Sequence, residues 1–207
     1  MEEKLIILDK NYLNSFNMAV AIHNAKVDVS LWPQGWIDFC SPCGVQHYRL
    51  LAEFGRIFKD KIFVDLGTLM GASSIALGAS FANKIYSFDL PVDNGGWVVD
   101  GKPPFVENSC LNIEYIKDNF FNHMSILESA VLILVDIDHS GIQEEKLIKE
   151  LSARNWKGLM ILDDVKDGVL KNLARDSGYN YCDLTKYGHY EGTHMIDFSN
   201  EYQVMLI

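Results

Sequence analysis

Short apolar runs alternate with amphipathic stretches along most of this chain. The apolar runs lie at 61–65, 84–88, 113–116, 131–135 and 158–162. Runs without a polar residue at every second position are typical of strands that are covered on both faces. Apolar residues at helical spacing lie between and before these runs, at 48–58, 72–79, 142–154 and 165–177. Strands that alternate with helices predict an α/β fold with a doubly wound, parallel sheet.

The alternation ends near the C-terminus. The runs at 179–184, 195–198 and 203–207 are strand-like, with only loops between them. Two strands without a helix between them must be able to pair antiparallel. We therefore expect a mostly parallel sheet that contains an antiparallel C-terminal strand. A chain of 207 residues fits one domain over 1–207, with a helical cover in 1–58 and the sheet in 59–207.

The charge balance limits the partners of the protein. The sequence has 18 Lys and Arg against 28 Asp and Glu, a formal charge of −10. Binding to nucleic acid or to an anionic membrane surface relies on clustered basic residues, so neither partner is expected. The longest apolar run, 130–135, is far shorter than the ~20 residues that span a bilayer.

The first residues and the cysteines bear on the compartment. The chain opens with Met1-Glu2-Glu3-Lys4, which is acidic where an export signal would be basic. We therefore expect a cytoplasmic protein with reduced cysteines. Cys40 and Cys43 form a C-x-x-C motif, but Cys110 and Cys182 are isolated, so the spacing does not predict a zinc ribbon.

The segment 64–73 is the strongest candidate for a ligand site. A buried strand ends at Asp65, the chain turns at Gly67, and a helix begins near Gly71. Glycines allow a ligand close to the backbone, and the start of a helix offers free amide groups. Asp89 ends the next strand, where a carboxylate can accept both hydroxyls of a ribose. This spacing favours a nucleoside cofactor.

Two residues of this loop argue against a dinucleotide. The G-x-G-x-x-G fingerprint would have a glycine where Thr68 stands. The negative charge of Asp65 would repel a pyrophosphate and attract an ammonium group. The sequence therefore favours a nucleoside with a cationic amino acid over a nicotinamide dinucleotide. The alternative is that this segment is only a tight strand-to-helix turn and binds no ligand.

Further carboxylates follow two later strands. Asp136, Asp138 and His139 come after the run at 131–135, and Asp163-Asp164 ends the run at 158–162. Carboxylates that converge at one sheet edge repel one another unless a cation lies between them, and oxygen ligands suit Mg²⁺. The alternative is that these residues cap helices and face solvent. His139 could act as a base or could support an aspartate.

The sequence resembles class I S-adenosylmethionine-dependent methyltransferases, close to the catechol, macrocin and cephalosporin-hydroxylase-like O-methyltransferases. The resemblance extends over about residues 45–207. It implies a Rossmann-like methyltransferase fold, which is a mostly parallel, seven-stranded sheet with a reversed last strand. The matching positions are Asp65, Gly67, Thr68, Gly71 and Ser73 in the loop, Asp136 to Ser140 after the fourth strand, and Asp163-Asp164 after the fifth.

The resemblance also implies roles for single residues. Asp65 would hold the methionine ammonium, Asp89 the ribose and Asn119 the adenine. Asp138, Asp163 and Asp164 would bind the metal, with Asp136 beside the cofactor. A two-residue shift of the strand end would exchange Asp136 and Asp138.

The catalytic base is less well defined. The catechol-type enzymes have a lysine where this chain has Gly141, and His139 is the nearest substitute. His139 and Asp138 are therefore the expected catalytic residues. The Gly- and Pro-rich stretch 91–108, with Trp97 and Phe105, could be a lid over the acceptor or a simple loop.

The expected activity is methyl transfer from S-adenosylmethionine to an oxygen of a small hydroxylated acceptor, assisted by Mg²⁺. Two other functions stay open: a nicotinamide-dependent oxidoreductase, and a cofactor-binding protein without turnover. The sequence leaves the acceptor and the oligomeric state, a homodimer included, undetermined.

Overall fold

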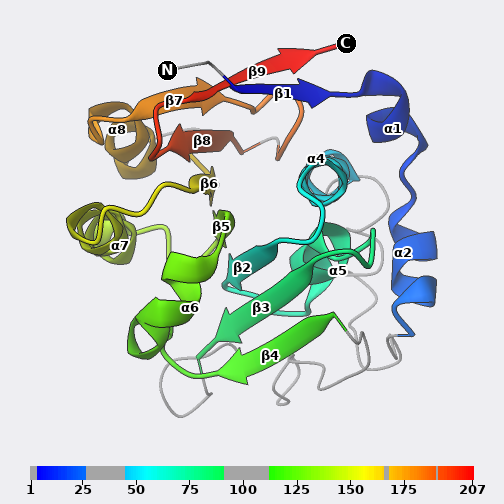
Figure 1. Ribbon diagram of the computed structural model, residues 1–207, viewed down its shortest axis with the longest axis horizontal. Helices are drawn as coiled ribbons and strands as arrows, with labels where there is room; N and C mark the ends of the chain where they lie inside the picture. Colours follow the sequence, from blue (N-terminus) through cyan, green and yellow to red (C-terminus); the bar gives the residue numbers. More distant parts are fainter. Residues whose placement is uncertain (1–3, 27–44, 91–111, 166–167, 190) are drawn as a thin grey trace.

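Seven strands form the central sheet of the computed structural model, which describes residues 4–26, 45–90, 112–165, 168–189 and 191–207. They are β2 (Ile62–Leu66), β3 (Lys84–Asp89), β4 (Ile113–Lys117), β5 (Leu132–Val135), β6 (Leu159–Asp163), β7 (Asn180–Asp183) and β8 (Thr193–Asp197). Their order in the sheet is β4-β3-β2-β5-β6-β8-β7 (Figure 1). Within the described residues, only β8 runs against its neighbours, pairing antiparallel with both β6 and β7. The predicted doubly wound sheet with a reversed C-terminal strand is confirmed.

The strand order reverses direction at β2. From β2 the chain proceeds outward through β3 to β4, and it then returns to the other side of β2 with β5. The carboxyl ends of β2 and β5 are therefore neighbours, although their loops leave toward opposite halves of the sheet. Ligands of open α/β sheets bind at such a reversal point.

Helices cover both faces of the sheet. One face packs against α4 (Val45–Ile57) and α5 (Ala72–Leu77), and α1 (Lys10–Ser15) and α2 (Met18–Asn24) pack on the outside of these two helices. The other face packs against η3 (Phe120–His123), α6 (Met124–Ser129), α7 (Ile142–Ala153) and α8 (Val169–Asp176).

Successive strand residues point to opposite faces, so the two cores share each strand. Phe63 is buried in the first core and Val64 in the second. Leu132 and Ile133 divide in the same way. This double burial explains the uninterrupted apolar runs in the sequence.

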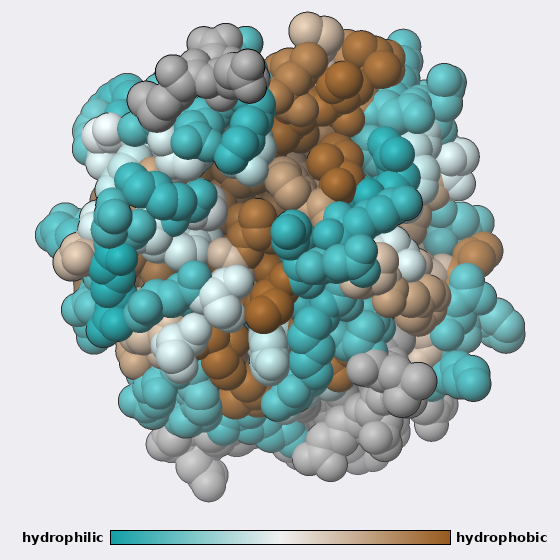
Figure 2. All heavy atoms as spheres, viewed as in Figure 1, coloured by the Kyte–Doolittle hydropathy of each residue, from teal (hydrophilic) through white to brown (hydrophobic). Residues whose placement is uncertain are grey.

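The N- and C-terminal segments meet outside the main sheet. The strands β1 (Lys4–Leu8) and β9 (Tyr202–Leu206) form a parallel pair (Figure 1). The run at 203–207 therefore leaves the main sheet, and the N-terminal cover contains a strand as well as helices. Figure 2 shows apolar surface over this ribbon, where the exposed side chains are Leu5, Ile7, Met205 and Ile207.

The predicted helix over 165–177 begins later, at Val169. Gly168 precedes it with φ +97° and ψ −137°, a conformation that only glycine adopts readily. The described part of the chain does not include Cys40, Cys43, Cys110 or the 91–108 stretch. In the described part, no helix is long and apolar enough to cross a membrane.

Candidate functional site

The loop between β2 and α5 makes a tight turn at the reversal point of the sheet. Gly67 has φ +89°, and its amide and that of Thr68 donate to the carbonyl of Phe88, at 3.0 and 3.1 Å. A Cβ on Gly67 would lie 1.6 Å from the carbonyl oxygen of Asp136. The glycine is therefore required by the close approach of the β2 and β5 ends.

Asp65 lies at the centre of this loop and is fully buried. Its Oδ2 accepts hydrogen bonds from the hydroxyls of Ser73 (2.8 Å) and Thr68 (3.1 Å), and also from Ser74 and Ser87. Its Oδ1 is buried without a hydrogen-bond partner in the described residues. Burial raises the pKa of this carboxyl, and the four hydroxyls oppose the rise. The unpartnered oxygen is suited to a cationic donor.

Asp89 holds the same loop from the end of β3. Its Oδ2 accepts from the amide of Leu69 at 2.9 Å, and its Oδ1 accepts from that of Leu90 at 2.8 Å. Burial raises the pKa of Asp89, and the two amides oppose the rise. Each carboxylate oxygen has a second lone pair, so the side chain can still accept from ribose hydroxyls.

Two residues of β4 and its loop lie near this edge. Asn119 is exposed and caps η3, its Oδ1 accepting from the amide of Phe121 at 2.9 Å. Tyr115, on β4, covers the loop, because a Cβ on Gly71 would lie 2.9 Å from its hydroxyl. The sequence gives no signal for Tyr115, because it is one of several aromatic residues in the strands.

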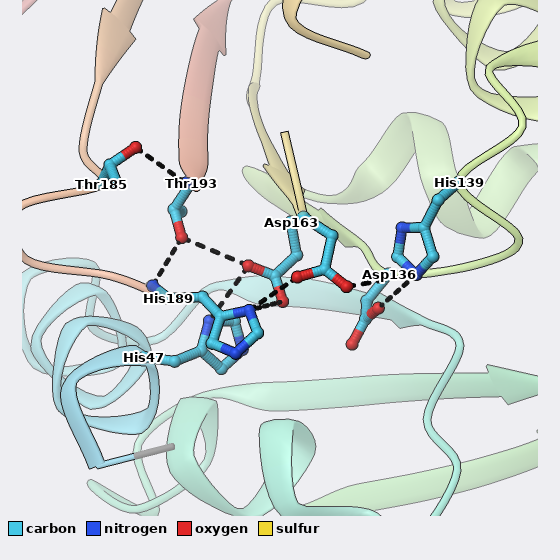
Figure 3. Close-up of polar contacts among 8 residues, drawn as sticks. His47, Asp136, His139, Asp163, Thr185, His189 and Thr193 are labelled. Carbon is cyan, nitrogen blue, oxygen red and sulfur yellow. Dashed lines mark hydrogen bonds and ion pairs between the residues drawn. The ribbon is translucent and has the colours of Figure 1, made fainter. Parts of the chain in front are cut away.

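The second group of carboxylates forms a cluster with histidines (Figure 3). On one side, His139 lies between two aspartates. Its Nε2 is 3.4 Å from Oδ1 of Asp136 and 3.6 Å from Oδ2 of Asp164. The buried Glu144 accepts from the amide of His139 at 3.1 Å and so supports the loop that carries this histidine.

On the other side, two more histidines face the carboxyl end of β6 (Figure 3). Nδ1 of His189 is 2.6 Å from Oδ1 of Asp164 and 3.6 Å from Oδ2 of Asp163. Nδ1 of His47, on α4, is 3.5 Å from Oδ1 of Asp163. Thr193 donates to the same Oδ1 at 3.2 Å.

Asp138 lies apart from this cluster. Its Oδ1 accepts from the amide and hydroxyl of Ser140, at 3.1 and 2.9 Å, in an exposed turn. Because β5 ends at Val135, Asp136 is the first residue past the strand, and it is Asp136 that lies near Asp164 and His139. The structure therefore brings Asp163 and Asp164 together with Asp136 and leaves Asp138 outside.

The cluster carries uncompensated negative charge. Among the described residues, no Lys or Arg forms an ion pair with Asp136, Asp163 or Asp164. Burial raises the pKa of Asp136 well above its usual value, and the charges of Asp163 and Asp164 add to the rise. The hydrogen bond from His189 lowers the pKa of Asp164. Burial opposes protonation of His189, but the two aspartates raise its pKa.

Ligand atoms gather closely at two places in the cluster. Within each group they lie within 4.8 Å of one another, a separation that one metal ion could bridge. The first group is Asp136, His139 and Asp164, and the second is Asp163, Asp164 and His189. The sequence gives no signal for His47 and His189, because neither stands near the carboxylate motifs.

Solved methyltransferases share this fold. The SAH-bound methyltransferase PaMTH1 of Podospora anserina is 15% identical, with a TM-score of 0.54 over 86% of this chain and 92% of that chain. Precorrin-6y C5,15-methyltransferase of Geobacter metallireducens is 16% identical, with a TM-score of 0.47 over 72% and 85% of the two chains. No protein-family profile and no curated protein matches the sequence. The likeness to PaMTH1 shows that the chain has a Rossmann-like methyltransferase fold.

Proposed function

We propose that this protein transfers a methyl group from S-adenosylmethionine to an oxygen of a small hydroxylated acceptor. The observation that carries the proposal is the unpartnered Oδ1 of the buried Asp65, at the reversal point of the sheet. A buried carboxylate oxygen without a donor costs about 1–3 kcal/mol, which a bound cationic group would recover. The shared methyltransferase fold supports the same cofactor.

The cofactor supplies an activated methyl group on a positively charged sulfur. In this proposal Asp65 accepts from the methionine ammonium, and Asp89 accepts from the ribose hydroxyls. The turn at Gly67, Thr68 and Gly71 holds the backbone close to the ligand, and Ser73 fixes the orientation of Asp65. Asn119 stays the candidate for the adenine.

The acceptor would lie beside the carboxylate cluster. Three carboxylates that form no ion pair with a Lys or Arg of the described residues suit a divalent cation, and oxygen ligands favour Mg²⁺. We assign this role to Asp163 and Asp164 with Asp136, because Asp138 is bound to Ser140. A metal there would lower the pKa of the acceptor hydroxyl. His139, about a third exposed, is placed to accept the proton.

Titration calorimetry with S-adenosylhomocysteine tests the cofactor assignment. Asp89→Asn keeps the shape of the side chain and one acceptor oxygen, but it loses the charge. We expect its affinity to fall by about 1.5–3 kcal/mol, or roughly 10–150-fold in Kd. Asp176→Asn removes an exposed carboxylate at the end of α8 and is the matched control.

Two results would contradict this assignment. One is equal affinity of wild type, Asp89→Asn and Asp176→Asn for S-adenosylhomocysteine, which would refute the cofactor site at Asp89. The other is binding of NADH, seen as a change in its fluorescence, without binding of S-adenosylhomocysteine. That result would favour an oxidoreductase.

A further inference from the structure

The two sides of the carboxylate cluster differ in chemistry. Each side has two aspartates and one histidine, but on the second side a further buried imidazole, that of His47, approaches Asp163, which directs both of its oxygens toward imidazoles. Its Oδ1 faces His47 and its Oδ2 faces His189 (Figure 3). These residues come from α4, from the end of β6 and from the loop between β7 and β8. Three distant parts of the chain thus converge on one point.

His47 is a buried member of this group whose ring nitrogen lacks a hydrogen bond in the described residues. The residue is only 5% exposed, and its Nδ1 is buried without a hydrogen-bond partner in the described residues. The nearest carboxylate oxygen, on Asp163, is 3.5 Å away, too far for a good hydrogen bond. Its ring lies edge-on to that of His189, with centroids 5.9 Å apart. A buried imidazole nitrogen directed at a carboxylate and a second imidazole is suited to bind a metal.

The ligand atoms of Asp163, Asp164 and His189 lie within 4.8 Å of one another, and His47 must move toward them to join one coordination shell. Bonds of about 2.0–2.1 Å to zinc place neighbouring ligand atoms roughly 3.3 Å apart. The separations of Asp163 Oδ1 from His47 Nδ1 and of Asp163 Oδ2 from His189 Nδ1 are 3.5 and 3.6 Å. The 2.6 Å hydrogen bond between His189 and Asp164 would be replaced by bonds to the metal.

A supporting outer shell is also present. Thr193 donates to Oδ1 of Asp163 at 3.2 Å and accepts from the amide of His189 at 2.8 Å. The amide of Thr193 in turn donates to the hydroxyl of Thr185 at 3.2 Å. Outer partners of this kind fix the orientation of metal ligands.

We propose that His47, Asp163, Asp164 and His189 form a binding site for a transition-metal cation of the zinc type. Imidazole ligands suit Zn²⁺, Fe²⁺ and related ions, whereas Mg²⁺ prefers oxygen. Asp164 bridges this site and the side with Asp136, because its Oδ1 faces His189 and its Oδ2 faces His139. A metal bound here would engage Asp163, so the Mg²⁺ of the proposed reaction would then rely on Asp136 and Asp164. The site does not depend on the methyltransferase assignment, since neither cofactor nor acceptor contributes a ligand.

Cobalt serves as the probe, because its visible absorption reports the coordination number and geometry of the bound ion. Chelator-treated full-length protein is titrated with Co²⁺ at neutral pH, and Zn²⁺ or excess Mg²⁺ is then added. We expect Zn²⁺ to displace Co²⁺ and Mg²⁺ to leave it bound. His189→Gln and His47→Gln should each weaken Co²⁺ binding by more than the ~10–100-fold that outer-shell changes cost. His194→Gln changes an equally buried histidine outside the cluster and should bind Co²⁺ like the wild type.

The wild-type protein provides a second readout in case a variant fails to fold. Long-range nitrogen–proton NMR spectra resolve the ring nitrogens of the six histidines. On addition of Zn²⁺, the Nδ1 resonances of two histidines, assigned to His47 and His189, should move to the metal-bound range. Unchanged ring nitrogens, full displacement of Co²⁺ by Mg²⁺, or variants that bind Co²⁺ like the wild type would overturn the proposal. S-adenosylhomocysteine binding on the same preparation tests the methyltransferase assignment separately.

Discussion

Replacement of Gly67 by alanine tests whether the reversal point of the sheet is packed as tightly as the structure indicates. Gly67 has φ +89°, and an added Cβ would lie 1.6 Å from the carbonyl oxygen of Asp136 and 2.6 Å from its carbonyl carbon. Both neighbours are backbone atoms at the end of a buried strand. They cannot turn away as a flexible side chain could, so the two loops must separate.

Gly178→Ala is the matched control. Gly178 has φ +82°, but nothing lies within 4 Å of an added Cβ. A left-handed conformation costs an L-residue roughly 1–2 kcal/mol. Alanine also restricts the unfolded chain, which returns about 0.4–1 kcal/mol. The free energy of unfolding should therefore fall by only about 1 kcal/mol in the control.

The same conformational cost applies at position 67, and broken contacts add to it. Moving the loop apart disrupts the hydrogen bonds from the amides of Gly67 and Thr68 to Phe88, and the 2.9 Å bond from the amide of Asp136 to Leu66. At about 1 kcal/mol each, these three bonds raise the total to roughly 4 kcal/mol. For a domain of this size that lowers Tm by roughly 8–16 °C, against about 2–4 °C in the control.

Thermal denaturation followed by circular dichroism measures both variants under the same conditions. The loop of Gly67 is also the proposed cofactor site, so Gly67→Ala should bind S-adenosylhomocysteine more weakly, while Gly178→Ala should bind it normally. Equal losses of Tm in the two variants would refute the close approach of β2 and β5.

Three further predictions concern the cluster and a buried histidine. His139→Gln should reduce turnover by roughly 10²–10⁴-fold with unchanged affinity for S-adenosylhomocysteine, and rescue of its rate by excess Mg²⁺ would contradict a role as base. EDTA should abolish activity, and Asp136→Asn should raise the Mg²⁺ concentration needed for half-maximal rate more than Asp138→Asn; activity that survives EDTA would refute metal assistance. Burial lowers the pKa of His194 below 6.5, so the unfolded chain binds its proton more readily and stability falls as pH drops below about 6.5. The fall in Tm from pH 8 to pH 5.5 should be smaller in His194→Gln, and an equal fall would show that His194 does not contribute.

The sheet could be predicted because its strands are buried on both faces. Apolar runs such as 131–135 and 158–162 contain the strands β5 and β6, with ends shifted by about a residue. The pairing partner of the run at 203–207 could not be predicted in this way. Its strand β9 pairs with β1, an apolar run at the opposite end of the chain, and a run of apolar residues does not show which distant strand it will pair with.

The candidate site shows a similar division. The sequence identifies Asp65 and Asp89, because each stands where a strand ends and its position follows from the strand pattern. It does not decide whether Asp136 or Asp138 faces the cluster, because a shift of the end of β5 by two residues would exchange them. His47 and His189 could not be found, because their role depends on which loops the fold brings to the edge of the sheet.

The reversed strand β8 explains why His189 reaches that edge. Because β8 pairs antiparallel with both β6 and β7, β7 runs parallel to β6 and ends at the same edge as Asp163. The register confirms this, since Thr193 at the start of β8 lies opposite Asp163. The loop between β7 and β8 must therefore pass over the carboxyl ends of the parallel strands. In an all-parallel sheet β8 would start at the opposite edge, so His189, which lies shortly before β8 in the chain, would be carried away from the carboxylates of β6.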